Sequence, residues 1–368
     1  MHVRYSYLSQ QFADIGGLMA EIEALVRSGD FTLGEPLARF EASFAALLGA
    51  RHAIGVGSGT DALKLPLRAL GIGPGDEVIT TANTFIATVG AIAEVGATPV
   101  FVDCDDTFCM DVGQVQAAIT PRTRAIMPVH YTGYMTDMPR LVEIAKGHDL
   151  PIVEDACQAI LADIGGKRAG TWGIAGGFSL HPLKNLNVWG DGGVIITDDD
   201  AMAAQLRLLR NHGMVNRDEI AVLGYNSRLD TLQAVVGNWL IPHTEAIAQA
   251  RIDNAAYYDA ALAEIPGVTL PPRGPGMRRV YHLYIVFAED RDALLAHCLA
   301  NGIEAKVHYP IPVYRQRALA HLGHREGDFP VADRHTKNII TFPCDQHLSR
   351  IEQDHVIATV REFYGAAR

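Results

Sequence analysis

The sequence contains no run of about 18 consecutive apolar residues, the length that a membrane-spanning helix needs. Its first residues, Met1 to Tyr7, also lack the basic and then apolar order of a secretory signal peptide. We therefore expect a cytoplasmic protein that has no membrane partner.

Basic residues are in the minority. The 368 residues include 31 lysines and arginines against 42 aspartates and glutamates, which gives a formal net charge of -11. No local basic patch offsets this total, so nucleic acid is not an expected partner. The chain also has no internal repeat and no low-complexity tract.

Cysteine is scarce as well. The five cysteines, Cys104, Cys109, Cys157, Cys298 and Cys344, form no Cys-x-x-Cys motif and no cluster with histidine. An odd number without such spacings predicts neither a disulfide framework nor a zinc site, and we expect no metal. Most of these side chains are expected to be small buried hydrophobes.

What the sequence does contain is an alternation of short apolar runs with amphipathic segments. After helices expected at 10–28 and 36–48, strands are expected at 53–56, 77–80, 99–102, 125–129, 151–154, 178–180 and 193–197, with helices near 61–70, 84–95, 111–118 and 137–147. Continuous apolar strands separated by helices are typical of a sheet that is covered on both faces. We therefore predict an α/β fold with a mostly parallel central sheet.

The organisation changes near residue 242, where a long helix is expected to run to about residue 262. Beyond it we expect a strand at 280–287, a helix at 290–300, a strand at 302–308 and a final helix at 351–363. This order predicts a smaller α+β domain. The expected domains are 1–241, with an N-terminal helical segment, and 242–368, which includes the long helix.

Three short stretches that follow or border expected strands carry the residue types of a chemical site. Gly57-Ser-Gly-Thr60 joins a strand to a helix and leaves backbone N–H groups free where a phosphate can bind. Asp155 follows the run 151–154, and Lys184 lies between an apolar run and a turn rich in glycine. Ligands of parallel sheets bind beyond the carboxyl ends of the strands, which is where these residues are expected to lie.

These features match the needs of a pyridoxal phosphate (PLP) enzyme. Such an enzyme needs an anion cradle, a carboxylate that keeps the pyridine nitrogen protonated, and a lysine that holds the cofactor as an imine and moves protons. Each feature alone has a plainer explanation, since Gly57–Thr60 would also suit a tight turn and Lys184 an ordinary loop. Their occurrence in one chain favours PLP bound covalently to Lys184, with Lys184 and Asp155 as catalytic residues.

Longer motifs are spread over nearly the whole chain. They are Ser28–Gly34, Gly57–Leu63, Gly73–Val78, Asn83–Thr88, Pro128–His130, Val153–Gln158, Phe178–Gly193, Arg210–Gly213 and Gly224–Arg228. Together they resemble the fold-type I aspartate aminotransferase superfamily and, within it, the DegT/StrS sugar aminotransferases. The dehydratase branch of that family has histidine in place of the lysine, so Lys184 argues against that branch.

The resemblance implies roles around the cofactor ring. Lys184 is the lysine that binds PLP covalently, Asp155 pairs with the pyridine nitrogen, and Gln158 lies by the phenolic oxygen. Phe85 is similar to the aromatic residue that stacks on the ring, a contact that suits a flat electron-poor ring. The plainer alternative for Phe85 is a place in the hydrophobic core.

The resemblance also implies a phosphate cradle and a dimer. Gly59, Thr60 and Ser179 correspond to the groups that bind the cofactor phosphate. Asn226 matches an asparagine that reaches across to the partner's phosphate, which implies a homodimer with shared active sites. The alternatives are a strand-end hydrogen bond for Ser179 and a helix-entry turn for Asn226.

The activity implied by the family is that of a PLP-dependent aminotransferase, or transaminase. It would carry an amino group from an amino acid such as glutamate to a keto-sugar, most simply a nucleotide-linked one, in amino-sugar biosynthesis. A cyclitol aminotransferase acting on a keto-inositol is an alternative, and a PLP-binding regulator without turnover is another. The presence of Lys184, Asp155 and Gln158 disfavours the regulator.

The turn after Lys184 leads to a hypothesis about the sugar position. Members of the family that aminate a 3-keto sugar tend to follow the lysine with Asn-Leu and a Gly-Asp-Gly turn, and residues 184–193 follow that pattern. The bulk of Trp189 and the charge of Asp191 would then select the carbonyl that meets the amine. The alternative is that Trp189 packs in the core and Asp191 only shapes the turn.

Overall fold

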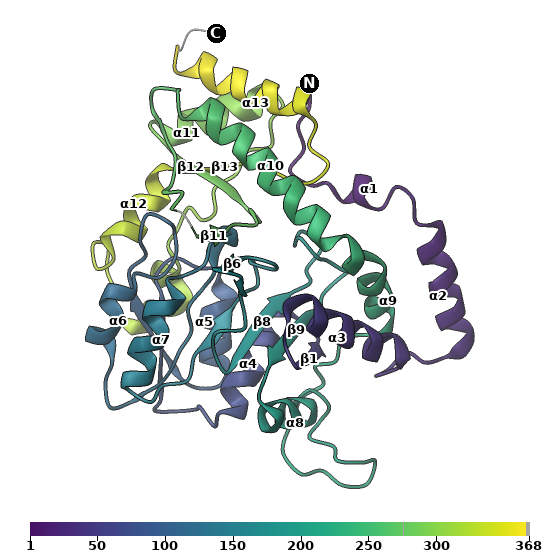
Figure 1. Ribbon diagram of the computed structural model, residues 1–368. Helices are drawn as coiled ribbons and strands as arrows, with labels where there is room; N and C mark the ends of the chain where they lie inside the picture. The colour runs from purple at the N-terminus through teal and green to yellow at the C-terminus, as the bar shows by residue number, and fades with distance from the viewer. Residues whose placement is uncertain (275, 366–368) are drawn as a thin grey trace.

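The computed structural model describes residues 1–274 and 276–365, and a mixed sheet lies at its centre (Figure 1). The strand order is β1-β9-β8-β5 followed by β4-β2-β3, and parallel bridges between 126 and 152 and between 129 and 155 join the two halves. The strands are β1 (His52–Val56), β2 (Glu77–Thr81), β3 (Thr98–Val102), β4 (Thr123–Ile126), β5 (Val153–Asp155), β8 (Ala175–Ser179) and β9 (Gly193–Thr197). Neighbouring strands are parallel except at β9, which runs antiparallel to β1 and β8. The predicted α/β class with a mostly parallel sheet is confirmed.

Helices cover both faces of this sheet. One face packs against α3 (Glu35–Leu48), α6 (Val112–Ala118), α7 (Met138–Gly147) and α9 (Thr231–Leu240), and the other against α4 (Gly59–Ala69), α5 (Ile86–Glu94) and α8 (Asp200–Leu209). Successive strand residues point to opposite faces, so Val194 and Ile196 join the first core and Ile195 joins the second. Burial on both faces explains why the strands are continuous apolar runs.

The C-terminal part has a core of its own. Helix α10 (Thr244–Leu262) leads to an antiparallel sheet of β10 (Val268–Thr269), β12 (Tyr284–Ala288) and β13 (Ile339–Phe342), with α11 (Arg291–Ala300) and α13 (Arg350–Phe363) beside it. Their buried side chains form a separate cluster that Val3 joins from the N-terminal segment. The division between residues 241 and 242 stays a prediction. In the ranges that the structure describes, no helix combines the length and apolarity needed to cross a membrane.

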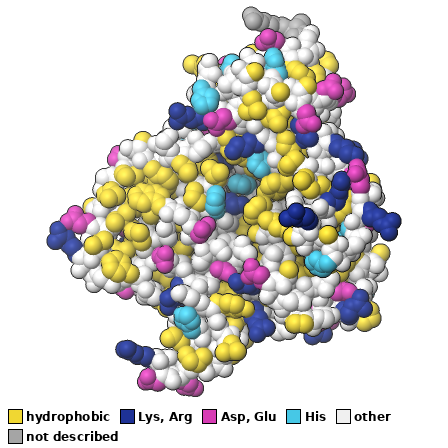
Figure 2. Space-filling view, turned by 180° about the vertical axis from the view of Figure 1, so that it is seen from behind, with side chains coloured by type: hydrophobic (Ala, Val, Ile, Leu, Met, Phe, Trp, Pro, Cys, Tyr) yellow, Lys and Arg dark blue, Asp and Glu magenta, His cyan; other side chains and the backbone are white. Residues whose placement is uncertain are grey.

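Shorter elements complete the chain. They are α1 (Leu8–Gln11), α2 (Gly16–Ser28), α12 (Pro330–Asn338), the small sheet of β6 (Asp163–Ile164), β7 (Lys167–Arg168) and β11 (Met277–Arg278), and 3-10 helices at 131–133, 241–243, 313–315 and 317–322. Seen from behind, hydrophobic side chains gather on one side of the molecule (Figure 2). Large hydrophobic residues that stay exposed along α2 and after it are Met19, Val26, Phe31 and Leu33.

Two expected elements differ from the structure. The helix expected at 10–28 is interrupted between α1 and α2, where Gly16 and Gly17 begin the second helix and have low helix propensity. The strand expected at 302–308 is absent, because this segment makes only single bridges, from Ile303 to Val3 and from Lys306 to Thr341. The partner that β12 does have, β13, was not expected from the sequence.

Glu154 fixes the end of β5 although it is fully buried. Its carboxylate accepts backbone hydrogen bonds from Gly170 (2.8 Å), Trp172 (2.6 Å) and Gly173 (2.8 Å). The Nε2 atom of His130 lies 2.8 Å from the same carboxylate. A buried carboxyl group with four hydrogen-bond partners is satisfied, and it ties the loop after β7 to the strand that carries Asp155.

We expect Glu154→Gln to lower the free energy of unfolding by about 3 kcal/mol, because an amide donor would then face backbone donors in a buried site. Glu143→Gln on the exposed side of α7 is the matched control, with an expected change within about 0.5 kcal/mol. Denaturant unfolding of both variants measures the difference. Equal midpoints for the two variants would show that Glu154 does not anchor the loop.

Candidate active site

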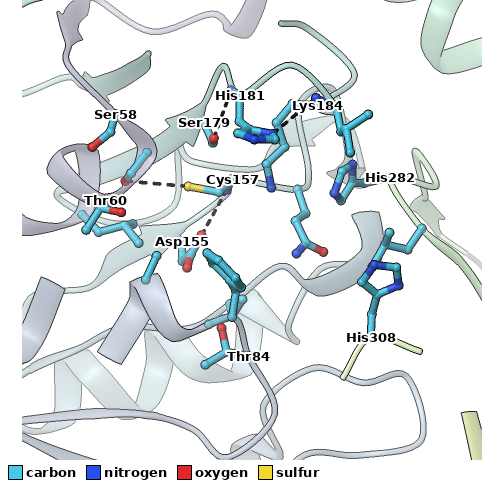
Figure 3. A pocket seen from close by; sticks show the side chains of 18 of the residues that line it. Ser58, Thr60, Thr84, Asp155, Cys157, Ser179, His181, Lys184, His282 and His308 are labelled. Carbon is cyan, nitrogen blue, oxygen red and sulfur yellow. Dashed lines mark hydrogen bonds between the residues drawn. The ribbon is translucent and has the colours of Figure 1, made fainter. Parts of the chain in front are cut away.

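A pocket of about 320 Å³ opens at the carboxyl ends of the parallel strands, between the large sheet and the C-terminal part (Figure 3). Its walls are Tyr5, Ser58, Gly59, Thr60, Leu63, Thr84, Phe85, Ala87, Val129, Asp155, Cys157, Gln158, Ser179, His181, Leu183, Lys184, Asp191, His282, Leu283, Lys306, His308 and Tyr309. The volume falls in the range typical of sites for cofactors and small molecules.

One end of the pocket has the form of an anion cradle. Helix α4 begins at Gly59, and its first backbone N–H groups have no partner inside the helix. The side chain of Ser58 caps the helix by accepting from the N–H of Asp61 (3.1 Å). A side chain at Gly59 would come within 2.6 Å of Ser179 Cβ, so only glycine lets the hydroxyl of Ser179 lie against the helix start. The arrangement suits a phosphate.

Asp155 provides a carboxylate in the middle of the pocket. It ends β5, and its Oδ2 atom accepts from the hydroxyl of Thr88 (2.7 Å), which lies 2.7 Å from the hydroxyl of Thr84. The Oδ1 atom accepts from the backbone N–H of Cys157 (3.1 Å). These bonds set the direction in which the carboxyl group faces the pocket.

Lys184 enters the same pocket from the turn after β8 (Figure 3). Its backbone N–H donates to the carbonyl of His181 (2.8 Å), which closes a tight turn. Burial lowers the pKa of the Lys184 ammonium from its usual value, and the nearby Cys157 and Asp155 oppose that shift only in part. A lysine with a lowered pKa has more of the neutral amine that attacks a carbonyl.

Phe85 and Gln158 complete the middle of the pocket. Phe85 precedes α5 and leaves 50% of its surface exposed, so it is not a core residue. Its exposed ring provides an aromatic face for a flat ligand. Gln158 is buried, and its Oε1 atom accepts from the backbone N–H of Thr132 (2.7 Å), which turns the amide nitrogen of the same group the other way.

The structure brings seven of the eight predicted site residues into this one pocket, namely Gly59, Thr60, Phe85, Asp155, Gln158, Ser179 and Lys184. Asn226 does not line it. Asn226 is exposed and forms a bridge with Asn211, while the hydroxyl of the next residue, Ser227, accepts from the N–H of Gly57 (3.2 Å). Asn226 is therefore next in sequence to a residue that contacts the cradle turn, but it does not line the pocket of its own chain.

Sequence reasoning missed the opposite wall, which Tyr5, His282, Lys306, His308 and Tyr309 form. Burial lowers the pKa of His282 well below its usual value, and burial with Lys306 and Lys184 lowers the pKa of His308 to about 4. Both imidazoles are therefore neutral at physiological pH. No local motif marks these residues, although histidine before tyrosine at the end of the run 302–308 was a weak signal.

The two residues proposed to select the sugar position separate in space. Asp191 lines the pocket, whereas Trp189 does not. The backbone of Trp189 exchanges hydrogen bonds with the side chain of Gln233 (2.8 and 3.0 Å), and its ring packs edge-on against Phe12 at 5.6 Å. Any direct contact with a ligand in this pocket therefore falls to Asp191.

Comparison with known sequences identifies the family. Residues 15–361 match the model of the DegT/DnrJ/EryC1/StrS aminotransferase family. The chain is 43% identical to the pleiotropic regulatory protein of Geobacillus stearothermophilus, with 99% of both chains covered. It is 44% identical to the dTDP-3-amino-3,4,6-trideoxy-alpha-D-glucose transaminase of Streptomyces venezuelae, over 94% of this chain and 91% of the relative. It is also 43% identical to the UDP-N-acetyl-3-dehydro-alpha-D-glucosamine 3-aminotransferase of Acidithiobacillus ferrooxidans, over 93% and 92%.

Solved structures agree with the fold. The crystal structure of DesV from S. venezuelae, in complex with a ketimine intermediate, superposes with a TM-score of 0.97 at 41% identity and covers all of both chains. The PLP form of the putative sugar aminotransferase Spr1654 from Streptococcus pneumoniae matches with a TM-score of 0.89 at 29% identity, over 95% of this chain and 96% of that one. The fold-type I architecture expected from the sequence is thereby confirmed. The chain belongs to the DegT/DnrJ/EryC1/StrS aminotransferase family, and it is a transaminase that uses PLP.

Proposed function

We propose that this protein transfers the amino group of glutamate to the 3-keto carbon of a nucleotide-linked sugar in the cytoplasm, with PLP held covalently by Lys184. The observation that carries the proposal is the convergence of the cradle, Asp155 and Lys184 in one pocket. Two relatives more than 40% identical support the ring position, since their names describe amino transfer at carbon 3 of a nucleotide sugar.

The residues present fit PLP. Glycine at position 59 lets Ser179 pack against the start of α4, so that its hydroxyl and the free backbone N–H groups of the helix can face one phosphate. Asp155 would hold the pyridine nitrogen, Gln158 the phenolic oxygen, and the exposed ring of Phe85 one face of the cofactor. When bound, PLP supplies an electron sink that stabilises negative charge on the carbon next to the transferred nitrogen.

The protein's own part in the reaction is to move one proton. The Nζ atom of Lys184 is freed when the donor amine displaces it. It then takes the α-proton of glutamate and delivers it to the carbon bonded on the other side of the transferred nitrogen. A water molecule supplies the keto oxygen of the 2-oxoglutarate that leaves, and a water is released when the sugar ketone runs the steps in reverse to become the amine. The neutral His282 and His308 close the wall around this proton path.

The position of Lys306 favours a substrate that carries an anionic group. Its ammonium lies 4.3 Å above the ring of Tyr5 on the pocket wall, and within residues 1–274 and 276–365 no carboxylate forms a salt bridge with it. A cation held on an aromatic face is available to a carboxylate or a phosphate. Glutamate and a nucleotide diphosphate both provide such a group.

We expect reduction of the holoenzyme with borohydride to attach the cofactor permanently to Lys184, because its amine has the lowered pKa and the place next to Asp155. Lys184→Ala should carry no attached cofactor and should lose about 10⁴-fold in turnover, the upper range for a general acid and base. Peptide mapping by mass spectrometry locates the label. Lys306→Ala is the matched control, since it removes the other lysine of the pocket and should still be labelled.

A label on Lys306, Lys64 or Lys167 in the wild-type protein would contradict the assignment. The same preparation tests the alternative of a PLP-binding regulator, which the name of the Geobacillus relative keeps in view. A transaminase converts its bound cofactor to the amine form when glutamate is added alone, and the visible absorbance changes. A regulator without turnover would leave the spectrum unchanged.

The ring position is tested with matched 3-keto and 4-keto nucleotide sugars, each supplied with glutamate and followed by mass. We expect amination of the 3-keto compound only, because the Gly190–Gly193 turn places the carboxylate of Asp191 on the pocket wall. Amination of the 4-keto compound alone would overturn the assignment of position. Amination of neither would favour a cyclitol such as a keto-inositol, which belongs in the same panel.

We also infer that the active unit is a homodimer with shared sites. Asn226 is exposed and does not line the pocket of its own chain, which leaves it available to a partner. The loop after α8 extends from the body in Figure 1 and exposes Val215, Ile220 and Leu223 to solvent. Exposed apolar side chains at this density are typical of a surface that another chain covers.

Co-expression of two differently tagged variants, Lys184→Ala and Asn226→Ala, tests the sharing. If Asn226 binds the partner's phosphate, each mixed dimer contains one site with both residues intact. With random pairing half of the dimers are mixed, so we expect about a quarter of wild-type activity at limiting PLP, while each variant alone stays near zero. If co-expression does not restore activity, or if the protein sediments as a monomer, the inference is wrong.

A further inference from the structure

The N-terminal segment reaches the lysine of the proposed active site from a distance of about 180 residues in sequence. Residues 3–11, which we call the N-terminal strap, begin at the C-terminal part of the protein. There Val3 donates to the carbonyl of Gly302 (2.9 Å) and accepts from Glu304 (3.0 Å). The backbone N–H of Tyr5 donates to the carboxylate of Glu304 (2.8 Å). The strap then crosses to the turn that carries Lys184.

Two side chains hold the backbone carbonyl of Lys184. The hydroxyl of Tyr7 donates to it at 3.0 Å, and the Nδ2 atom of Asn187 donates to it at 2.9 Å. The backbone N–H of Lys184 is already bonded to His181, so both polar backbone groups of this residue are fixed. Burial raises the pKa of Tyr7, which keeps its hydroxyl protonated and able to donate.

Further hydrogen bonds extend from Asn187 and form a closed network. The Oδ1 atom of Asn187 accepts from Gln11 (3.0 Å), whose own side-chain oxygen accepts from Gln346 (2.5 Å). Gln346 in turn accepts from Nε of Arg251 on α10 (3.1 Å). The guanidinium of Arg251 lies 5.1 Å from the centre of the Tyr7 ring, and this contact closes the network at the residue where it began.

The members of this network are buried except for Gln346, which is half-buried, and they come from four separate places in the chain. Tyr7, Gln11, Asn187 and Arg251 are each less than a tenth exposed. Arg251 also donates to the carbonyls of Tyr281 (3.1 Å) and Cys344 (3.0 Å). A buried polar network in which each member is bonded has one arrangement of low energy, because any shift leaves donors without acceptors.

We propose that Tyr7 and Asn187 are positioning residues for Lys184. We also propose that the N-terminal strap couples the direction in which the Lys184 side chain approaches the cofactor to the position of the C-terminal part. Neither residue lines the pocket, so each acts through the Lys184 carbonyl. With both backbone groups fixed, only the side-chain torsions of Lys184 remain free. The direction from which its amine meets the reacting carbon is therefore set in advance. The proposal rests on the function proposed above for Lys184.

The test compares Tyr7→Phe with the wild-type holoenzyme. This change keeps the ring under Arg251 and removes only the hydroxyl. We expect the rate constant for conversion of the bound cofactor by glutamate to fall about tenfold, which is within the cost of a small misplacement, while the KM for glutamate changes little. We also expect the pH at which the visible absorbance of the bound cofactor titrates to shift, because the amine no longer approaches at the same angle.

Tyr314→Phe is the matched control. Tyr314 is also buried and its hydroxyl donates to Asp333 (2.5 Å), but it touches neither the pocket nor the turn of Lys184. We expect it to lower the melting temperature as Tyr7→Phe does and to leave the absorbance titration and the glutamate rate unchanged. A shift of equal size in both variants would mean that general loosening of the fold is responsible, and would overturn the proposal.

Asn187→Ala supplies a second variant if Tyr7→Phe does not fold, since it removes the other donor to the same carbonyl. The same shift in titration is expected. If either folded variant titrates and reacts like the wild type, the proposal is wrong. Borohydride mapping of the wild-type protein separates this failure from failure of the proposed function. If Lys184 carries no label, the proposed function is wrong; if it carries the label and the variants behave like the wild type, only the positioning role is wrong.

Discussion

The arrangement of the site depends on how the end of β5 is held. Two acidic residues stand side by side there, and the alternation of a strand sends them to opposite sides. Glu154 faces inward and is satisfied by three backbone N–H groups and His130, whereas Asp155 faces the pocket and is bonded to Thr88. The carboxylate of Glu154 stabilises the loop after β7. The carboxylate of Asp155 is thereby left facing the pocket, where a ligand can bind. One short strand thus serves stability on one side and chemistry on the other.

The pocket lies where two kinds of wall meet. The wall from the large sheet is built of strand ends and a helix start, whose positions follow from the hydrogen bonding of the sheet. The wall from the C-terminal part presents His282, Lys306 and His308. Lys306 makes a single bridge to Thr341, and the ring of His308 lies 2.9 Å from the hydroxyl of the same threonine. The first wall carries the residues proposed to hold the cofactor, and the second carries Lys306, which is proposed to meet an anionic group of a substrate.

The sequence predicted the first wall well and the second hardly at all. Gly57–Thr60, Asp155 and Lys184 are recognisable because each depends on its immediate neighbours: a glycine turn before a helix, an acid after a buried strand, and a lysine beside glycines. Tyr5 and His308 meet only after some 300 intervening residues have folded, and no local pattern reports such a contact. The expected strand at 302–308 failed for the same reason, because its hydrogen bonds go to Val3 on one side and to Thr341 on the other.

The attachment of the strap has a consequence for the order in which the protein acquires its structure. The partners of Val3 and Tyr5, which are Gly302 and Glu304, are synthesised about 300 residues after them. The large sheet can pair its strands before then, since its contacts are made among residues 52–197. The carbonyl of Lys184 receives its Tyr7 bond only after the chain has been made beyond residue 304 and the two ends have met. Completion of the site is therefore among the last events of folding, and long-range contacts of this kind make such steps slow.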